Sequence, residues 1–198
     1  FKAHKTPEIA RRQLAAGPCT GPTCATVGEA EIVAGFCDDL LLANEVVTSE
    51  KCARVAALAR KVRVTVAVDS LAGLSALSRA ASDAGANIGV LVDLNVGQGR
   101  CGVEPGEASL TLAGQAAQSK GITLRGVMGY EGHLQPIRDR AEREARTRQA
   151  MPDMSAQPAR NSKAAEAAAS NGPRARRSGN VVVVIFHVPA RPYGLGVG

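Results

Sequence analysis

The first residues of the chain carry side chains that can do covalent chemistry. Lys2, His4 and Lys5 lie within five residues of the start, and Thr6 followed by Pro7 signals the start of a helix. A lysine amine placed just before a helix, in a chain that alternates strands and helices, can attack carbonyl compounds as a nucleophile. Two solvated lysines at a chain terminus are the alternative interpretation.

A second group of reactive side chains follows a predicted strand. Tyr130, Glu131 and His133 lie within four residues, beside two glycines that permit close approach of other groups. A histidine transfers protons near neutral pH, so His133 is a candidate acid or base. A surface histidine without a chemical role is the alternative interpretation.

Residues 97–102 match G-x-G-x-x-G, the pattern of dinucleotide-binding loops. In such loops the third glycine packs within the following helix, and an acidic residue ends a strand about 20 residues later. Here the next helix is predicted only at Pro105, no such acid follows, and Arg100 stands where the backbone would approach a pyrophosphate. The pattern therefore favours a tight turn that directs Arg100 into the site.

Apolar, β-branched segments alternate with helical patterns along most of the chain. The strands are predicted at residues 23–27, 39–43, 62–68, 88–93 and 123–128. The helices are predicted at residues 6–17, 28–34, 49–61, 71–84, 105–121 and 138–149. The predicted N-terminal caps are Thr6, Ser49 and Asp69-Ser70, and Gly17 is the predicted glycine stop of the first helix. This alternation indicates a parallel sheet built from βα units.

Polar side chains stand at the ends of these strands, and they favour one of two architectures. The residues are Asn44, Asp69, Asp93, Asn95 and Tyr130. A closed barrel presents such residues from many strands at once, whereas an open doubly wound sheet concentrates them near one switch point. We therefore predict an α/β fold of the TIM-type (β/α)₈ class. The barrel is incomplete, because the five predicted strands are too few to close a barrel of eight. The doubly wound sheet is the alternative.

Composition and charge exclude several classes of protein. The net charge is +6, but residues 1–151 are nearly neutral, so nucleic-acid binding is not predicted. The five cysteines form no C-x-x-C pair, and Cys19 and Cys24 have no histidine nearby, so we expect reduced thiols and no zinc site. No apolar run has membrane-spanning length and no signal peptide is recognised, so we expect a cytoplasmic protein without a membrane partner.

The composition changes at Met151. Residues 152–198 are rich in Ala, Ser, Pro, Arg and Asn and poor in large apolar residues, which is typical of a low-complexity tail. One segment near 180–188 has a strand pattern and is suited to pairing with a sheet edge. We therefore predict a partial barrel at 1–151 and a tail at 152–198.

Six segments of the chain, in order, resemble one enzyme family. They are KAHKTPEIARRQ, TCATVGEAE, LLANEVV, VAVDS, VDLNVGQGRCGV and GYEGH. Their order and spacing are similar to those of the D-threonine aldolase and D-serine dehydratase-like family. These are fold-type III pyridoxal-phosphate enzymes with an alanine-racemase-type N-terminal barrel, and the resemblance covers residues 1 to about 151.

The resemblance implies a role for four residues. Lys2 falls on the lysine that forms the Schiff base with pyridoxal phosphate, with Lys5 as the alternative if the register is shifted by one lysine. Arg100 falls near the ring oxygen of the cofactor, Tyr130 on a residue that positions it, and His133 on a candidate general base.

The implied function is cleavage of D-3-hydroxy amino acids to glycine and an aldehyde. The alternatives are a D-serine dehydratase or an amino-acid racemase of the same fold, or a non-catalytic fragment that at most binds pyridoxal phosphate. The implied partners are a small D-amino acid substrate and a second copy of the chain in a homodimer.

The family also uses a divalent metal (Mn²⁺, Mg²⁺ or Zn²⁺) that lowers the pKa of the substrate β-hydroxyl. Its ligands are a His-x-Cys or His-x-Asp pair in a C-terminal β domain. His187 has Pro189 two residues on, so no metal ligand is predicted in this chain. We likewise expect the strand before Lys2 and the glycine-rich phosphate loop to lie outside it, and Glu45 stands where the family usually has Gln.

Overall fold

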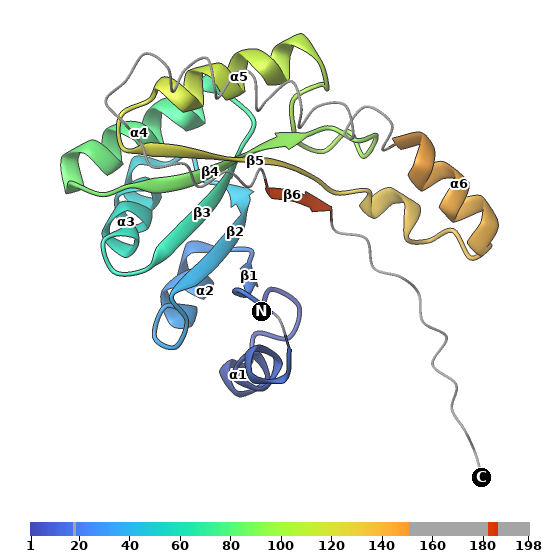
Figure 1. The fold of residues 1–198 in the computed structure, drawn as a ribbon, viewed down its shortest axis with the longest axis horizontal. Coiled ribbons are helices and arrows are strands. Elements are labelled where there is room, and N and C mark those ends of the chain that lie inside the picture. Colours follow the sequence, from blue (N-terminus) through green and yellow to red (C-terminus); the bar gives the residue numbers. More distant parts are fainter. Residues whose placement is uncertain (18, 151–181, 186–198) are drawn as a thin grey trace.

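The centre of the molecule is a parallel β-sheet whose strands follow one another in chain order (Figure 1). The computed structural model describes residues 1–17, 19–150 and 182–185. The strands are β1 (Thr23–Cys24), β2 (Asp39–Glu45), β3 (Arg63–Val68), β4 (Ile88–Leu94), β5 (Ile122–Gly129) and β6 (Val182–Ile185). Each neighbouring pair from β1 to β6 runs parallel.

This strand order distinguishes the two predicted architectures. A doubly wound sheet reverses its order at a switch point, whereas the strands of a (β/α)₈ barrel keep the order of the chain. The prediction of an incomplete TIM-type barrel is therefore confirmed. Strand β6 lies within the segment predicted to be strand-like and pairs with the edge at β5. The rest of the predicted tail lies outside the described residues.

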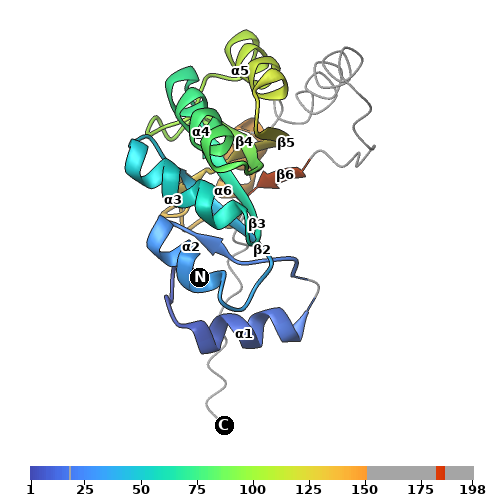
Figure 2. The ribbon, with the colours of Figure 1, turned by 90° about the vertical axis from the view of Figure 1, so that its left-hand side faces the viewer.

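Helices connect the strands and cover one face of the sheet (Figure 2). They are α2 (Val27–Val33), α3 (Ser49–Ala59), α4 (Leu71–Ala84) and α5 (Glu107–Gln118). Helix α1 (Pro7–Ala16) precedes β1, and α6 (Arg140–Ala150) follows the short 3₁₀ helix η1 (Gly132–Leu134). All six predicted helices are therefore present, although their bounds differ by a few residues.

Three hydroxyl side chains fix where helices begin. Thr26 accepts the backbone N–H of Glu29, at 3.2 Å, and so starts α2 at Val27 and ends β1 early. Ser70 caps α4 in the way that the sequence predicts. For α3 the cap is Thr48, not Ser49 as expected, because its hydroxyl and not that of Ser49 reaches the third helical N–H.

Helix α1 differs from expectation at both ends. Thr6 occupies the N-cap position, but its hydroxyl donates to the carbonyl of His4 and caps nothing. Gly17 follows the helix in an extended conformation (φ −167°), which any residue adopts, so it is no left-handed glycine stop. The left-handed stop occurs instead on α4, at Gly85 (φ 61°).

Alternating residues of the strands build two apolar layers. Leu42, Val66 and Val90 point toward the helices and are fully buried with the side chains of α2–α5. Ala67 and Leu91 face the other side, in a smaller cluster completed by residues of β2 and β5. Burying each large aliphatic side chain contributes about 1.5–3 kcal/mol, so Val, Leu, Ile and Ala supply most of the stabilisation, as the scarcity of aromatic residues predicts.

Polar residues fill the inner face of the sheet near its amino end. Arg125 donates to the hydroxyl of Thr65 at 2.6 Å and lies 3.5 Å from a carboxylate oxygen of Asp39. A Cβ at Gly89 would come within 2.6 Å of the Arg125 side chain. Glycine at this position of β4 therefore leaves room for the arginine side chain to extend over β4 toward Thr65. The amino end is thus occupied by a structural ion pair, and the opposite end holds the candidate site.

Two further findings concern the chain as a whole. All five cysteines are free thiols, as predicted. Within the described residues, no helix combines the length and the apolar character needed to cross a membrane.

Candidate active site

The carboxyl ends of β2 and β4 bring two acidic side chains and a thiol together. Glu45 ends β2, Asp93 lies near the end of β4, and Cys101 follows in the β4–α5 loop. One ligand atom of each lies within 4.8 Å of the other two. The Cys101 thiol donates to Asp93 Oδ2 at 3.4 Å. Asp93 is only 4% exposed, so its carboxyl meets little water.

This environment changes how the acidic group titrates. Burial, followed by the hydrogen bond with the neighbouring Glu45 carboxyl, raises the pKa of Asp93 from 3.8 to about 7. Burial also raises the pKa of the Cys101 thiol. Near neutral pH the Asp93 carboxyl is therefore protonated in part of the molecules, and the Cys101 thiol keeps its proton. The group is a proton-holding site at the mouth of the partial barrel.

The loop after β4 is held in one conformation by hydrogen bonds between its backbone N–H groups and two side-chain oxygens. Asn95 Oδ1 accepts the N–H groups of Gly97 and Gly99 at 3.2 and 3.0 Å. The N–H of Gly102 donates to Asp69 Oδ2 at 3.3 Å, which ties the loop to the end of β3. All three glycines have positive φ angles, and α5 begins only at Glu107. The loop is the tight turn that the sequence predicts, without the helix packing of a dinucleotide site.

This loop presents Arg100 to the end of β5. The Arg100 guanidinium carbon lies 5.9 Å from the centre of the Tyr130 ring, within the range of a cation–π contact. A Cβ at Gly132 would come within 2.4 Å of the same ring, so glycine is needed for Tyr130 to fold back over η1. Gln135 donates to the Tyr130 hydroxyl at 3.2 Å.

His133 lies beside the start of the same loop, at Gly97. A Cβ added at Gly97 would be 3.2 Å from His133 Nε2, which places the imidazole directly beside the loop backbone. Three of the four predicted site residues, Arg100, Tyr130 and His133, are thus brought together at the carboxyl ends of β4 and β5. A guanidinium, a phenol and an imidazole can hold an anionic ring oxygen and move a proton next to it.

Lys2 lies at the opposite edge of the sheet. Its backbone N–H donates to the carbonyl of Thr23 in β1 at 3.0 Å, and its side chain is exposed. Within residues 1–17 and 19–150, the structure gives the Lys2 amine no ion-pair partner. Lys5, the alternative lysine, is paired with the buried carboxylate of Glu29. In the strand order, β2 and β3 stand between Lys2, beside β1, and the group of Arg100, Tyr130 and His133 (the Arg100 group) at the ends of β4 and β5.

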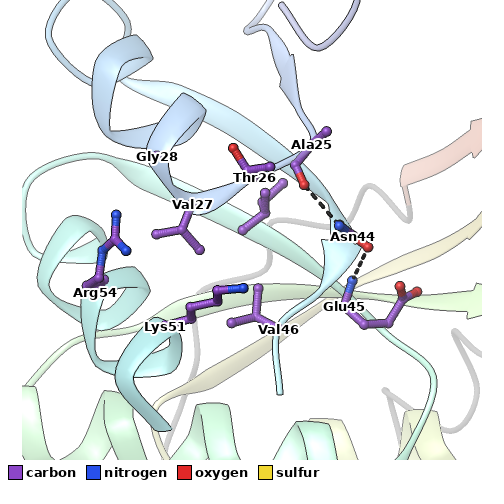
Figure 3. A pocket seen from close by; sticks show the side chains of 10 residues that line it. Ala25, Thr26, Val27, Gly28, Asn44, Glu45, Val46, Lys51 and Arg54 are labelled. Atoms are coloured by element: carbon purple, nitrogen blue, oxygen red, sulfur yellow. Dashed lines mark hydrogen bonds between the residues drawn. The ribbon is translucent and has the colours of Figure 1, made fainter. Parts of the chain in front are cut away.

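A pocket of about 120 Å³ opens between the β1–α2 and β2–α3 connections (Figure 3). Lys51 and Arg54 of α3 line it, and Arg54 is held by two hydrogen bonds to Glu31 at 2.9 and 2.7 Å. Asn44 donates to the carbonyl of Ala25 at 3.0 Å and closes one wall. The pocket lies beside the barrel mouth and not within the Arg100 group.

The sequence interpretation missed the group of Glu45, Asp93 and Cys101 as a unit. Asp93 was predicted as a strand-end residue, which places it at the carboxyl edge, whereas Glu45 was noted only as standing where the family usually has Gln. Their mutual approach depends on the irregular pairing between Leu42 and Glu45, where the register of β2 against β3 shifts. A bulge of this kind redirects a side chain, and the sequence carries no mark of it.

Comparisons with known proteins identify the family. Residues 2–180 match the model of the alanine racemase N-terminal domain, and the chain belongs to this family. It is 46% identical to a D-threonine aldolase of an Arthrobacter species over 150 residues, which are 75% of this chain and 39% of that protein. It is 35% identical to a 3-hydroxy-D-aspartate aldolase of Paracoccus denitrificans over 147 residues, 73% of this chain and 38% of that one.

A solved structure agrees with these relatives. The crystal structure of D-threonine aldolase from Filomicrobium marinum matches with a TM-score of 0.79 and 39% identity, over 82% of this chain and 44% of that one. The resemblance inferred from the six segments is thus confirmed. The chain spans about two fifths of the length of the curated relatives it matches.

Proposed function

We propose that this chain carries the cofactor-binding barrel of a pyridoxal-phosphate-dependent lyase that cleaves D-3-hydroxy amino acids to glycine and an aldehyde. The proposal rests chiefly on the joint position of Arg100, Tyr130 and His133 at the barrel mouth. The aldolases that the chain resembles at 46% and 35% identity support the same reaction class.

The types of side chain present suit the cofactor's ring and aldehyde, with Lys2 beside β1 and the other residues at the ends of β4 and β5. Lys2 offers an exposed primary amine without an ion-pair partner in the described part of the chain, as an amine that binds an aldehyde must. Arg100 offers a guanidinium for the ring oxygen, and Tyr130 an aromatic face beside it. When bound, pyridoxal phosphate supplies an electron sink for negative charge at the substrate Cα.

The remaining residues act on protons. His133 accepts the proton of the substrate β-hydroxyl, so that the Cα–Cβ bond can break with the β-carbon leaving as an aldehyde. Asp93, whose pKa is raised to about 7, holds a proton at the barrel mouth and lowers the negative charge there. Tyr130 is kept in place by Gln135 and by Arg100.

We do not assign the family's metal to the group of Glu45, Asp93 and Cys101. Asp93 binds a proton near neutral pH, and the neighbouring Arg100 guanidinium repels a cation. The proposed metal ligands therefore remain the pair predicted outside this chain. A homodimer and a cytoplasmic location complete the proposal.

Product analysis distinguishes the candidate reactions. The chain is incubated with pyridoxal phosphate, Mn²⁺ and D-threonine, and the products are separated. The proposal expects equal amounts of glycine and acetaldehyde, both lost in Lys2→Ala. Appearance of 2-oxobutanoate and ammonia identifies a dehydratase, and appearance of L-allo-threonine, the product of inversion at Cα alone, identifies a racemase. Cofactor binding at Lys2 without any product identifies a binding protein without turnover.

A further inference from the structure

We propose that Glu29 is a positioning residue, which fixes the segment carrying Lys2 through an ion pair with Lys5. This inference rests on the proposed function of Lys2 and adds the ion pair that holds the Lys2 backbone in place. Glu29 stands on α2, 27 positions along the chain from Lys2, in the segment TCATVGEAE, and the resemblance assigns it no role.

The Glu29 carboxylate joins three parts of the chain. One oxygen, Oε1, accepts a hydrogen bond from the Lys5 amine, and the other, Oε2, accepts the backbone N–H of Ala25 at 2.7 Å. The N–H of Glu29 itself donates to the Thr26 hydroxyl that caps α2. The terminal segment, the β1–α2 connection and the first turn of α2 are thereby bound to one side chain.

Burial makes this ion pair necessary. The side chain of Glu29 is 8% exposed and that of Lys5 is 62% exposed. Burial by itself raises the pKa of the Glu29 carboxyl, but the hydrogen bonds from Lys5 and from the Ala25 N–H outweigh it, and the pKa lies below its ordinary value. A buried carboxylate that stays charged requires a charged partner, and Lys5 is that partner.

The ion pair acts on Lys2 through a tight turn. The N–H of Lys5 donates to the carbonyl of Phe1 at 2.8 Å, and the N–H of Lys2 donates to the carbonyl of Thr23 at 3.0 Å. Lys5 also adopts a left-handed conformation (φ 56°), which is uncommon for a residue other than glycine and persists only where contacts impose it. Lys5 is thus committed to holding the turn, and Lys2 is left as the free amine.

The first test needs no cofactor and compares two glutamates of the same helix. Glu29→Gln removes the charge that pairs with Lys5, whereas Glu31→Gln removes the charge that pairs with Arg54 on α3 and serves as the matched control. The measurement is hydrogen exchange of the Lys2 backbone amide. We expect exchange to accelerate roughly tenfold or more in Glu29→Gln and to stay at the wild-type rate in Glu31→Gln. Equal exchange in Glu29→Gln and wild type would overturn the proposal.

The second test distinguishes the roles of the two lysines. Pyridoxal phosphate is added, bound cofactor is fixed by borohydride, and the labelled lysine is found by peptide mapping. Lys5→Arg keeps the ion pair and should keep labelling at Lys2, whereas Lys5→Met should reduce the rate of labelling roughly tenfold. Loss of labelling in Lys5→Arg would show that Lys5 is the nucleophile, against the proposal. If nothing is labelled in the wild type, the proposed function fails while the exchange result stands.

Discussion

Single glycines allow the side chains of the candidate site to approach the neighbouring chain segments. Gly97 leaves room for the His133 imidazole, and Gly132 leaves room for the Tyr130 ring. The two residues come from the end of β5 and meet a loop from the end of β4 that carries Arg100. At the scale of the residue, the geometry of the site therefore depends on the missing side chains of Gly97 and Gly132 as well as on the side chains of His133 and Tyr130.

His133 tests the proposed proton transfer. Because its imidazole is assigned to the substrate hydroxyl and not to the cofactor, His133→Ala should lower the rate of glycine formation from D-threonine by roughly 10²–10⁴-fold. The same variant should retain the visible absorbance band of the lysine-bound cofactor. Loss of the band, or glycine formation at the wild-type rate, would assign His133 another role.

The raised pKa of Asp93 should make the stability of the folded chain depend on pH. Its carboxyl is buried and its pKa in the folded state is about 7, above the 3.8 of an exposed carboxyl. Between these values the folded chain binds more protons than the unfolded chain, so the free energy of unfolding should fall as pH rises from about 4 to 7. The neutral isostere Asp93→Asn should remove most of this loss and be more stable than wild type at pH 8, by on the order of 2 kcal/mol.

Thermal or urea unfolding at pH 5 and pH 8 measures this difference. Wild type and Asp93→Asn should have similar stability at pH 5, where Asp93 is protonated, and should diverge at pH 8. Parallel pH profiles for the two proteins would show that Asp93 titrates as an ordinary carboxyl.

At the scale of the element, the β4–α5 loop determines the geometry of the candidate site, because it carries Arg100 and lies beside Tyr130 and His133. Its backbone is closed by paired hydrogen bonds between Val103 and the residues that end β4, at 2.9 Å each. Gly102 has φ 94°, and a Cβ there would come within 2.6 Å of the Asn95 nitrogen. The neighbouring atoms are backbone, so they cannot move aside cheaply. The position of Arg100 depends on this close approach.

Gly102→Ala should therefore destabilise the chain by about 2–3 kcal/mol and separate Arg100 from Tyr130. The matched control is Gly114→Ala, inside α5, where a Cβ meets nothing within 4 Å and helix propensity improves by about 0.5–1 kcal/mol. Unfolding curves measure both variants. A Gly102→Ala protein as stable as wild type would contradict the loop geometry described above.

The elements show which sequence signals were sufficient. The cap of α4 was expected at Asp69-Ser70, and Ser70 provides it, because its hydroxyl directly precedes the first residue of the helix. Thr48 and Ser49 offer the same chemistry at adjacent positions, and only the path of the chain out of β2 decides between them. Helix bounds were thus predictable to within a few residues, whereas the choice of cap between two adjacent polar residues was not.

At the scale of the whole molecule, the strand order explains why the fold was predictable and the site only in part. Alternating strand and helix patterns imply parallel βα units, and strand-end polar residues imply the working edge, so Arg100, Tyr130 and His133 could be placed together. Contacts between residues distant in sequence depend on register shifts and buried charges, which local sequence patterns do not reveal. The contacts of Asp93 with Glu45 and of Lys5 with Glu29 are of this kind, and they were therefore not predicted.

The central claim is that Lys2 is the amine through which this barrel binds pyridoxal phosphate. The most direct measurement is borohydride reduction of the chain with pyridoxal phosphate, followed by mass spectrometry of the N-terminal peptide. The account predicts one cofactor per chain, attached to Lys2, and no attachment in Lys2→Ala. Attachment at Lys5, or at exposed lysines such as Lys51 and Lys120 to the same extent as at Lys2, would contradict it.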